Sequence, residues 1–76
     1  MEILDSVKIA FEKVLGRPMK EFGRDTTPRQ LPMWDSVAHV NIILEIEREF
    51  EIEFSPRAMA ELTSVGAICD AVRAAI

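Results

Sequence analysis

The stretch that decides the fold is Trp34-Asp35-Ser36-Val37, which continues without a break into the amphipathic run from Ala38 to Phe50. No proline or glycine interrupts this run, and its apolar positions recur at three- and four-residue spacing, so it predicts a helix over residues 36–51. The face expected to be buried consists of His39, Ile42, Ile43, Ile46 and Phe50.

A second apolar stripe on the same helix is made of Val37, Val40 and Leu44. Together the two stripes cover more of the circumference than one core-facing stripe requires. The second stripe either packs under a loop or another helix, or it is a partly exposed docking surface with an acidic rim. The polar residues that border it are Asn41, Glu47, Arg48 and Glu51.

The remaining chain predicts three further helices, over residues 2–15, 55–61 and 64–76. Ser55 and either Thr63 or Ser64 are suited to cap the last two. Residues 16–35 form a long connection, with a short turn possible from Met19 to Phe22. The side chains expected to hold this connection on the bundle are Phe22, Leu31, Met33 and Trp34. The prediction is an all-α fold, a four-helix bundle with three longer helices, one short helix and a long loop between the first two, in a single domain over residues 1–76.

Charge and composition exclude several classes of function. The net charge is −4, with +1 in residues 1–34 and −5 in residues 35–76, so a duplex-binding protein such as a helix-turn-helix domain is not expected. Basic protein partners fit this charge better. One cysteine and one histidine exclude an internal disulfide and make a structural zinc site improbable. Without a signal-peptide pattern or a membrane-spanning run, we expect a cytoplasmic monomer that binds no membrane.

Ser36 is the residue expected to carry the chemistry. Local sequence alone favours a helix N-cap, because serine at the first turn of a helix is most often a cap. A hydrolase nucleophile is disfavoured: no glycine-rich elbow surrounds Ser36, and His39, one turn away, points toward the buried side. A serine that another enzyme modifies needs only exposure at a rigid place, and a helix N-terminus also favours an attached phosphate.

The segment Trp34-Asp35-Ser36-Val37, with the acidic amphipathic helix after it, resembles the acyl carrier protein family, whose signature is Asp-Ser-Leu before such a helix. The resemblance continues through Glu53-Phe54-Ser55-Pro56 into Leu62-Thr63-Ser64-Val65 and covers about residues 3–76. Val37 stands where leucine is usual, and Ala38 and Asn41 stand where many fatty-acid-synthesis carriers have acids. The pattern of Trp34 before Asp-Ser and His39 after it resembles stand-alone carriers of specialised pathways more than the housekeeping carrier.

The resemblance implies that Ser36 receives a 4′-phosphopantetheine arm from coenzyme A through a separate phosphopantetheinyl transferase that uses Mg²⁺. Asp35 would help the transferase recognise the site. The arm's thiol would hold an acyl or aminoacyl group as a thioester, so the protein itself would catalyse nothing. Its partners would be the transferase, an acyl- or aminoacyl-loading enzyme, and downstream synthases or transferases of fatty-acid-like, polyketide or nonribosomal peptide chemistry. The docking residues would be Val37, Val40, Asn41, Leu44, Glu47, Arg48 and Glu51.

Two other interpretations remain open from the sequence. The chain could be an unmodified helical protein–protein interaction module with a carrier-like fold, which would tolerate Ser36→Ala, whereas a carrier would not.

His39 is expected to tie the second helix to the loop or to another helix, with a role in guiding the arm or a partner as the alternative. Trp34 is expected to fix the approach to Ser36, and Cys69 to be a small buried residue of the last helix.

Overall fold

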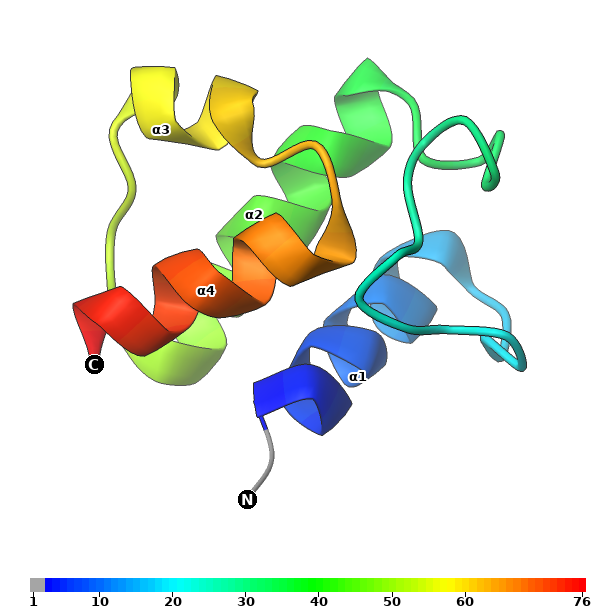
Figure 1. Ribbon diagram of the computed structural model, residues 1–76, viewed down its shortest axis with the longest axis horizontal. Coiled ribbons are helices and arrows are strands. Elements are labelled where there is room, and N and C mark those ends of the chain that lie inside the picture. Colours follow the sequence, from blue (N-terminus) through cyan, green and yellow to red (C-terminus); the bar gives the residue numbers. More distant parts are fainter. Residues whose placement is uncertain (1–2) are drawn as a thin grey trace.

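The computed structural model describes residues 3–76, which form four α-helices and no strand (Figure 1). The helices are α1 (Ile3–Leu15), α2 (Ser36–Phe50), α3 (Pro56–Glu61) and α4 (Val65–Ala75). The predicted all-α bundle, with three longer helices, one short helix and a long loop between α1 and α2, is confirmed. The predicted start of the first helix at Glu2 lies outside the described residues.

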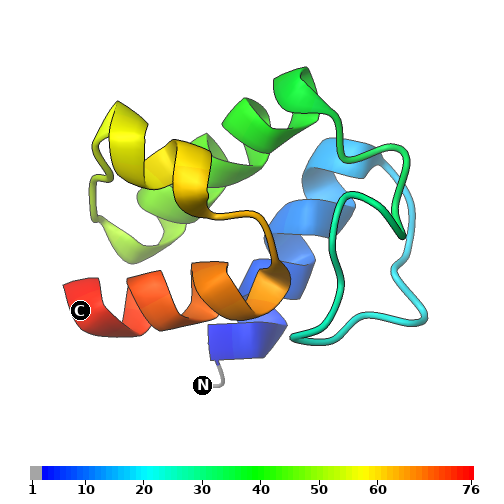
Figure 2. The ribbon, with the colours of Figure 1, turned by 45° about the horizontal axis from the view of Figure 1, so that its top comes forward.

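The core lies where α1, α2 and α4 meet. α1 packs against both α2 and α4, and apolar side chains from all three helices are fully buried. Those with no exposed surface are Val7, Phe11, Ile42, Ile43, Ile46, Val65, Ile68 and Val72. No residue of α3 is buried, and both ribbon views place this helix away from α1 (Figures 1 and 2). The short helix therefore reaches the core only through the partly buried Met59 and, just after its end, the buried Leu62.

The last residues of α2 and α4 differ from the prediction, and the cap of α4 is one of the two predicted. α2 stops at Phe50, because Glu51 adopts a left-handed conformation (φ 55°) and its N–H donates to the Glu47 carbonyl. This is a common way to end a helix, although glycine is preferred at such a position. Ser64, and not Thr63, caps α4 by accepting a hydrogen bond from the Ala67 N–H. The last helix was predicted to run to residue 76, but α4 ends at Ala75, and Ile76 after it is exposed.

The loop over residues 16–35 is fixed to the bundle by its backbone and by a few side chains. The carbonyls of Arg24 and Thr26 accept hydrogen bonds from the N–H groups of Gly66 and Val65, at 2.9 and 3.0 Å. The loop thereby satisfies amides that the start of α4 would otherwise leave without acceptors. The Arg24 guanidinium also donates to the Asp70 carboxylate at 3.0 Å.

The apolar side chains of the loop contribute unequally. Trp34 is buried, and Phe22 and Leu31 pack against the core, as predicted. Met33 does not, because it is 38 % exposed and its sulfur accepts a hydrogen bond from the Arg17 guanidinium. Met19, a loop residue that was not predicted to pack on the bundle, is buried. The turn suggested for residues 19–22 is only a bend at residues 20–21, and the turns of the loop lie at residue 16 and at residues 24–25, 28–30 and 32–33.

Candidate functional site

The start of α2 is capped by Asp35 and not by Ser36. Asp35 has an extended backbone, and its Oδ1 accepts a hydrogen bond of 2.8 Å from the Ala38 N–H. Its carbonyl accepts the first helical bond, from the His39 N–H. The local expectation that Ser36 is the N-cap is therefore wrong: two adjacent residues could serve, and the acid does. Ser36 is the first residue of the helix proper.

This assignment leaves the Ser36 hydroxyl available. Ser36 is exposed, and its side chain makes no hydrogen bond to any residue between 3 and 76. The N–H groups of Ser36 and Val37 lie in the first turn, where a helix has no acceptor of its own for them. A phosphate attached to this oxygen would be close to both amides and to the positive end of the helix dipole. The residues present fit a phosphodiester on Ser36.

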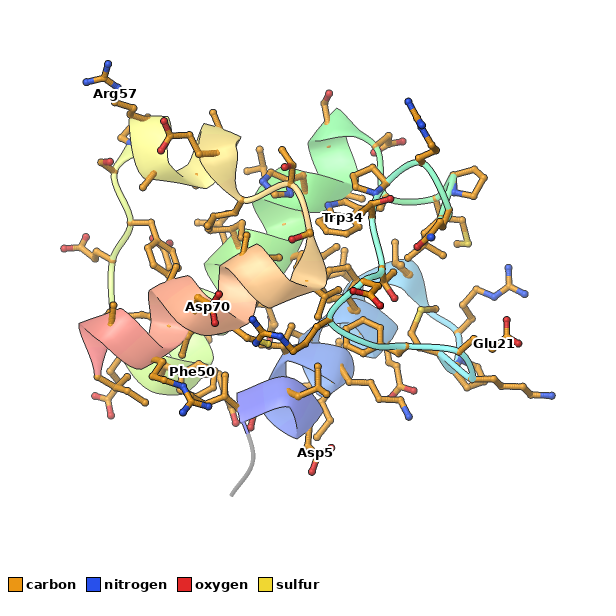
Figure 3. All side chains as sticks on the ribbon, in the orientation of Figure 1. Asp5, Glu21, Trp34, Phe50, Arg57 and Asp70 are labelled. Atoms are coloured by element: carbon orange, nitrogen blue, oxygen red, sulfur yellow. The ribbon has the colours of Figure 1, made fainter. Side chains whose placement is uncertain are left out.

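A cleft of about 690 Å³ opens beside Ser36. The end of the long loop and α2 form one side of it, and α3 with its flanking residues forms the other. Its walls are mostly apolar, and its lining includes Pro28, Trp34, His39, Val40, Phe54 and Met59. Phe54 and Met59 were not expected at the site, since neither follows Ser36 closely and nothing in their local sequence marks them. Figure 3 places Trp34 between the end of the loop and the helices.

His39 connects Trp34 to α3 through both nitrogens of its ring. The Trp34 Nε1–H donates to His39 Nδ1 at 2.8 Å, and His39 Nε2 lies 2.8 Å from the Met59 carbonyl. Because indole nitrogen can only donate and a carbonyl can only accept, His39 is the neutral tautomer with its proton on Nε2. The expected structural role, tying α2 to another helix, agrees with this geometry. With both nitrogens engaged, His39 is not placed to act as a base for Ser36.

The second apolar stripe of α2 is exposed. Val37, Val40 and Leu44 are 71 %, 43 % and 49 % exposed, so the interpretation that they pack under the loop or another helix is wrong. Asn41, Arg48 and Glu51 also lie on the surface. Three exposed aliphatic side chains along one face of a helix are a candidate contact surface for another protein.

Glu47 differs from the other residues predicted to border the stripe. Its Oε2 accepts a hydrogen bond of 2.7 Å from the Phe54 N–H, and its side chain is only partly exposed. A carboxylate that accepts a backbone N–H in this way holds the chain between α2 and α3. Glu45, two residues earlier, lies 3.4 Å from the Lys13 ammonium and 3.8 Å from the Arg48 guanidinium. Part of the acidic character of this helix is thus used within the fold.

Neither Cys69 nor a metal-ligating cluster adds to the site at Ser36. Burial raises the pKa of the Cys69 thiol, which is only 3 % exposed on α4. The described part of the chain, residues 3–76, contains no cluster of three or more metal-ligating side chains. Within the same residues no helix has both the length and the apolar character needed to span a membrane.

Comparison with known proteins agrees with this site. The family described as "Phosphopantetheine attachment site" matches residues 5–72. The solution structure of a holo acyl carrier protein from Geobacter metallireducens superimposes with a TM-score of 0.87 and 28 % sequence identity, covering 99 % of this chain and 86 % of that one. A search of curated proteins gives no match. With a family match over most of its length and this shared fold, the chain belongs to the acyl carrier protein family, and its cofactor is a covalently attached 4′-phosphopantetheine.

Proposed function

We propose that Ser36 is the attachment residue for the 4′-phosphopantetheine and that the chain carries acyl or aminoacyl groups between biosynthetic enzymes. The observation that carries this proposal is the unused, exposed hydroxyl at the first residue of α2, directly after a cap supplied by Asp35. The other serines with a clear helix-terminal position, Ser55 and Ser64, use their hydroxyls as caps. Of the three, only Ser36 therefore offers its oxygen without loss of a cap.

The residues around Ser36 hold and present the attachment point. Asp35 fixes the first turn through Oδ1, and its exposed carboxylate is available for recognition by the phosphopantetheinyl transferase. The first-turn amides favour the phosphate, and α2 keeps the attachment point at a constant place. When bound, the group supplies a terminal thiol that holds the cargo as a thioester. The carrier would catalyse no step itself, because both ring nitrogens of His39 are engaged and the Asp35 carboxylate caps the helix.

The exposed stripe of α2 is the proposed docking surface for the partner enzymes. Val37, Val40 and Leu44 provide apolar contact, and Asn41, Arg48 and Glu51 surround it. A stripe of this size with polar borders suits contacts that form and dissociate quickly, as a shuttling carrier requires. The partners would be the transferase, an acyl- or aminoacyl-loading enzyme and downstream synthases or transferases. Glu47 would act on docking only through the loop that it holds.

The proposal also covers the pathway, the oligomeric state and the location of the protein. We place it in a specialised fatty-acid-like, polyketide or peptide pathway, because Ala38 and Asn41 replace acids of the usual carrier surface and Arg48 interrupts its glutamates. Partners adapted to a changed charge pattern would account for these residues. Residues 1–76 would act as one carrier domain, monomeric and cytoplasmic.

The test uses acetyl-coenzyme A, Mg²⁺ and a broad-specificity phosphopantetheinyl transferase, with intact-mass detection. The wild-type chain should gain one acetylphosphopantetheine, and hydroxylamine should then remove only the acetyl group, as it does from a thioester. Ser55→Ala is the matched control for Ser36→Ala and should be modified like the wild type. A chain that keeps its fold but gains no mass with several transferases would instead support the interaction-module alternative.

A further inference from the structure

Two rings lie between the cleft beside Ser36 and the part of the core around Phe11. Trp34 lines the cleft, and its other neighbour is Phe11, a fully buried residue that does not line it. The rings of Trp34 and Phe11 meet edge-on, with centroids 4.8 Å apart and planes at 90°. The Trp34 ring therefore lies between the cleft and Phe11, whereas Leu62, another core residue, lines the cleft itself.

His39 holds this ring and the opposite wall at the same time. It stacks on Trp34, with centroids 5.8 Å apart and planes at 24°, and it accepts the indole N–H. Its Nε2–H binds the Met59 carbonyl on α3, a helix without a buried residue of its own. Moving Trp34 away from His39 would leave the buried indole N–H without its acceptor, which is unfavourable in an apolar setting. Moving α3 away would break the bond from His39 to the Met59 carbonyl, which would keep the Leu62 N–H as a donor.

We propose that Trp34 and His39 form a latch that confines cargo to the surface cleft and keeps it away from the part of the core around Phe11. His39 is then a positioning residue, because it acts through Trp34 and α3 and does not touch the attachment oxygen. This inference rests on the proposed function for the identity of the ligand, a thioester cargo on Ser36. A chain too long for the cleft would keep apolar surface in water, since the latch bars it from the space beside Phe11.

Two substitutions separate the hydrogen bonds of His39 from its bulk. His39→Leu fills similar space but can make neither bond, whereas His39→Gln keeps one acceptor and one donor in a planar group. Val72→Ala is the matched control, because it weakens the core on α4 without touching the latch. Trp34 is the only tryptophan and the chain has no tyrosine, so intrinsic fluorescence reports on the latch alone.

The first measurement uses the unmodified protein and does not depend on the proposed function. In His39→Leu, acrylamide should quench Trp34 several-fold more efficiently than in the wild type. Amides of α3 should exchange several-fold faster relative to those of α4, the change expected for the loss of the one neutral hydrogen bond that joins His39 to this helix. His39→Gln and Val72→Ala should behave like the wild type. Equal quenching in His39→Leu and the wild type, or an equal rise in Val72→Ala, would overturn the latch.

The second measurement locates the cargo. Isotope-filtered NMR on protein loaded from butanoyl- or octanoyl-coenzyme A should give contacts from the acyl chain to Val40 and Met59, and none to Phe11. In His39→Leu the octanoyl chain should also contact Phe11. Contacts to Phe11 in the loaded wild type would refute the confinement of cargo. If Ser36 cannot be loaded, the proposed function fails, and the quenching and exchange data alone decide whether the latch exists.

Discussion

Exchanging Asp35 and Ser36 for alanine, one at a time, distinguishes the residue that builds the site from the residue that would bear the cofactor. In the structure Asp35 Oδ1 accepts the Ala38 N–H at 2.8 Å, while the Ser36 hydroxyl makes no bond to any described residue. The two substitutions are adjacent and remove a similar amount of side chain. They should nevertheless affect stability very differently.

The magnitude follows from the cap and from its charge. Loss of an N-cap costs about 1 kcal/mol, within a range of about 0.5–2 kcal/mol. The negative charge of Asp35 at the positive end of the helix adds about 0.3–1 kcal/mol. Asp35→Ala should therefore lower the free energy of unfolding by about 1–2 kcal/mol, and each kcal/mol corresponds to a fall in Tm of about 4–8 °C for a domain of this size. Ser36→Ala should change stability by less than about 0.5 kcal/mol, since alanine suits the first turn of a helix and no bond is lost.

Urea denaturation followed by circular dichroism measures both effects on the unmodified protein. Asp35→Asn is the informative third variant, because asparagine caps as well as aspartate but carries no charge. It should retain most of the stability and yet be a poorer substrate for the transferase if the carboxylate serves recognition. The reasoning would be refuted if Ser36→Ala lost about 1 kcal/mol while Asp35→Ala lost none, because Ser36 would then be the cap.

Three further predictions concern the surfaces and the thiol of the molecule. Leu44→Ala, on the exposed stripe, should change stability by less than about 0.5 kcal/mol but raise the KM of partner enzymes, whereas the fully buried Ile43→Ala should cost about 2–5 kcal/mol; equal losses of stability would contradict the assignment of the two faces. Glu47→Ala should cost about 1–2 kcal/mol in urea denaturation, since the Phe54 N–H loses a charged acceptor that is partly screened by water; an unchanged midpoint would show that this bond is not significant. Cys69 should not react quickly with a thiol reagent at neutral pH, because burial raises its pKa and keeps it protonated, so an unmodified chain should show no fast thiol and a modified chain one; a fast reaction before modification would contradict this.

The helices and their order could be predicted because the apolar periodicity of α1, α2 and α4 is strong and the breakers between them are clear. The sequence does not predict which residue caps α2, since Asp35 and Ser36 are both good caps. The left-handed Glu51 carries no sequence signal, because glycine or asparagine would be expected at such a position.

Long-range contacts to the backbone were beyond reach of sequence reasoning. His39, expected on the buried face, is half-buried and lines the cleft. Its partner is the carbonyl of Met59, twenty residues later, and a carbonyl has no signature in sequence. The same holds for Glu47, which was placed among docking residues on its charge and its position, although it bonds the Phe54 N–H. In the loop, Met19 and Met33 could not be told apart by hydrophobicity, and the burial of one and not the other depends on how the turns fall.

The central claim is that Ser36 carries the prosthetic group, and mapping the modification on the wild-type chain tests it most directly. Trypsin should release residues 30–48 as one peptide, in which Ser36 is the only hydroxyl-bearing side chain. After reaction with coenzyme A and a phosphopantetheinyl transferase, tandem mass spectrometry of the digest should find the 4′-phosphopantetheine on this peptide and on no other, with fragment ions that place it on Ser36. Finding it on a peptide that carries Ser55 or Ser64, or on none, would contradict the account.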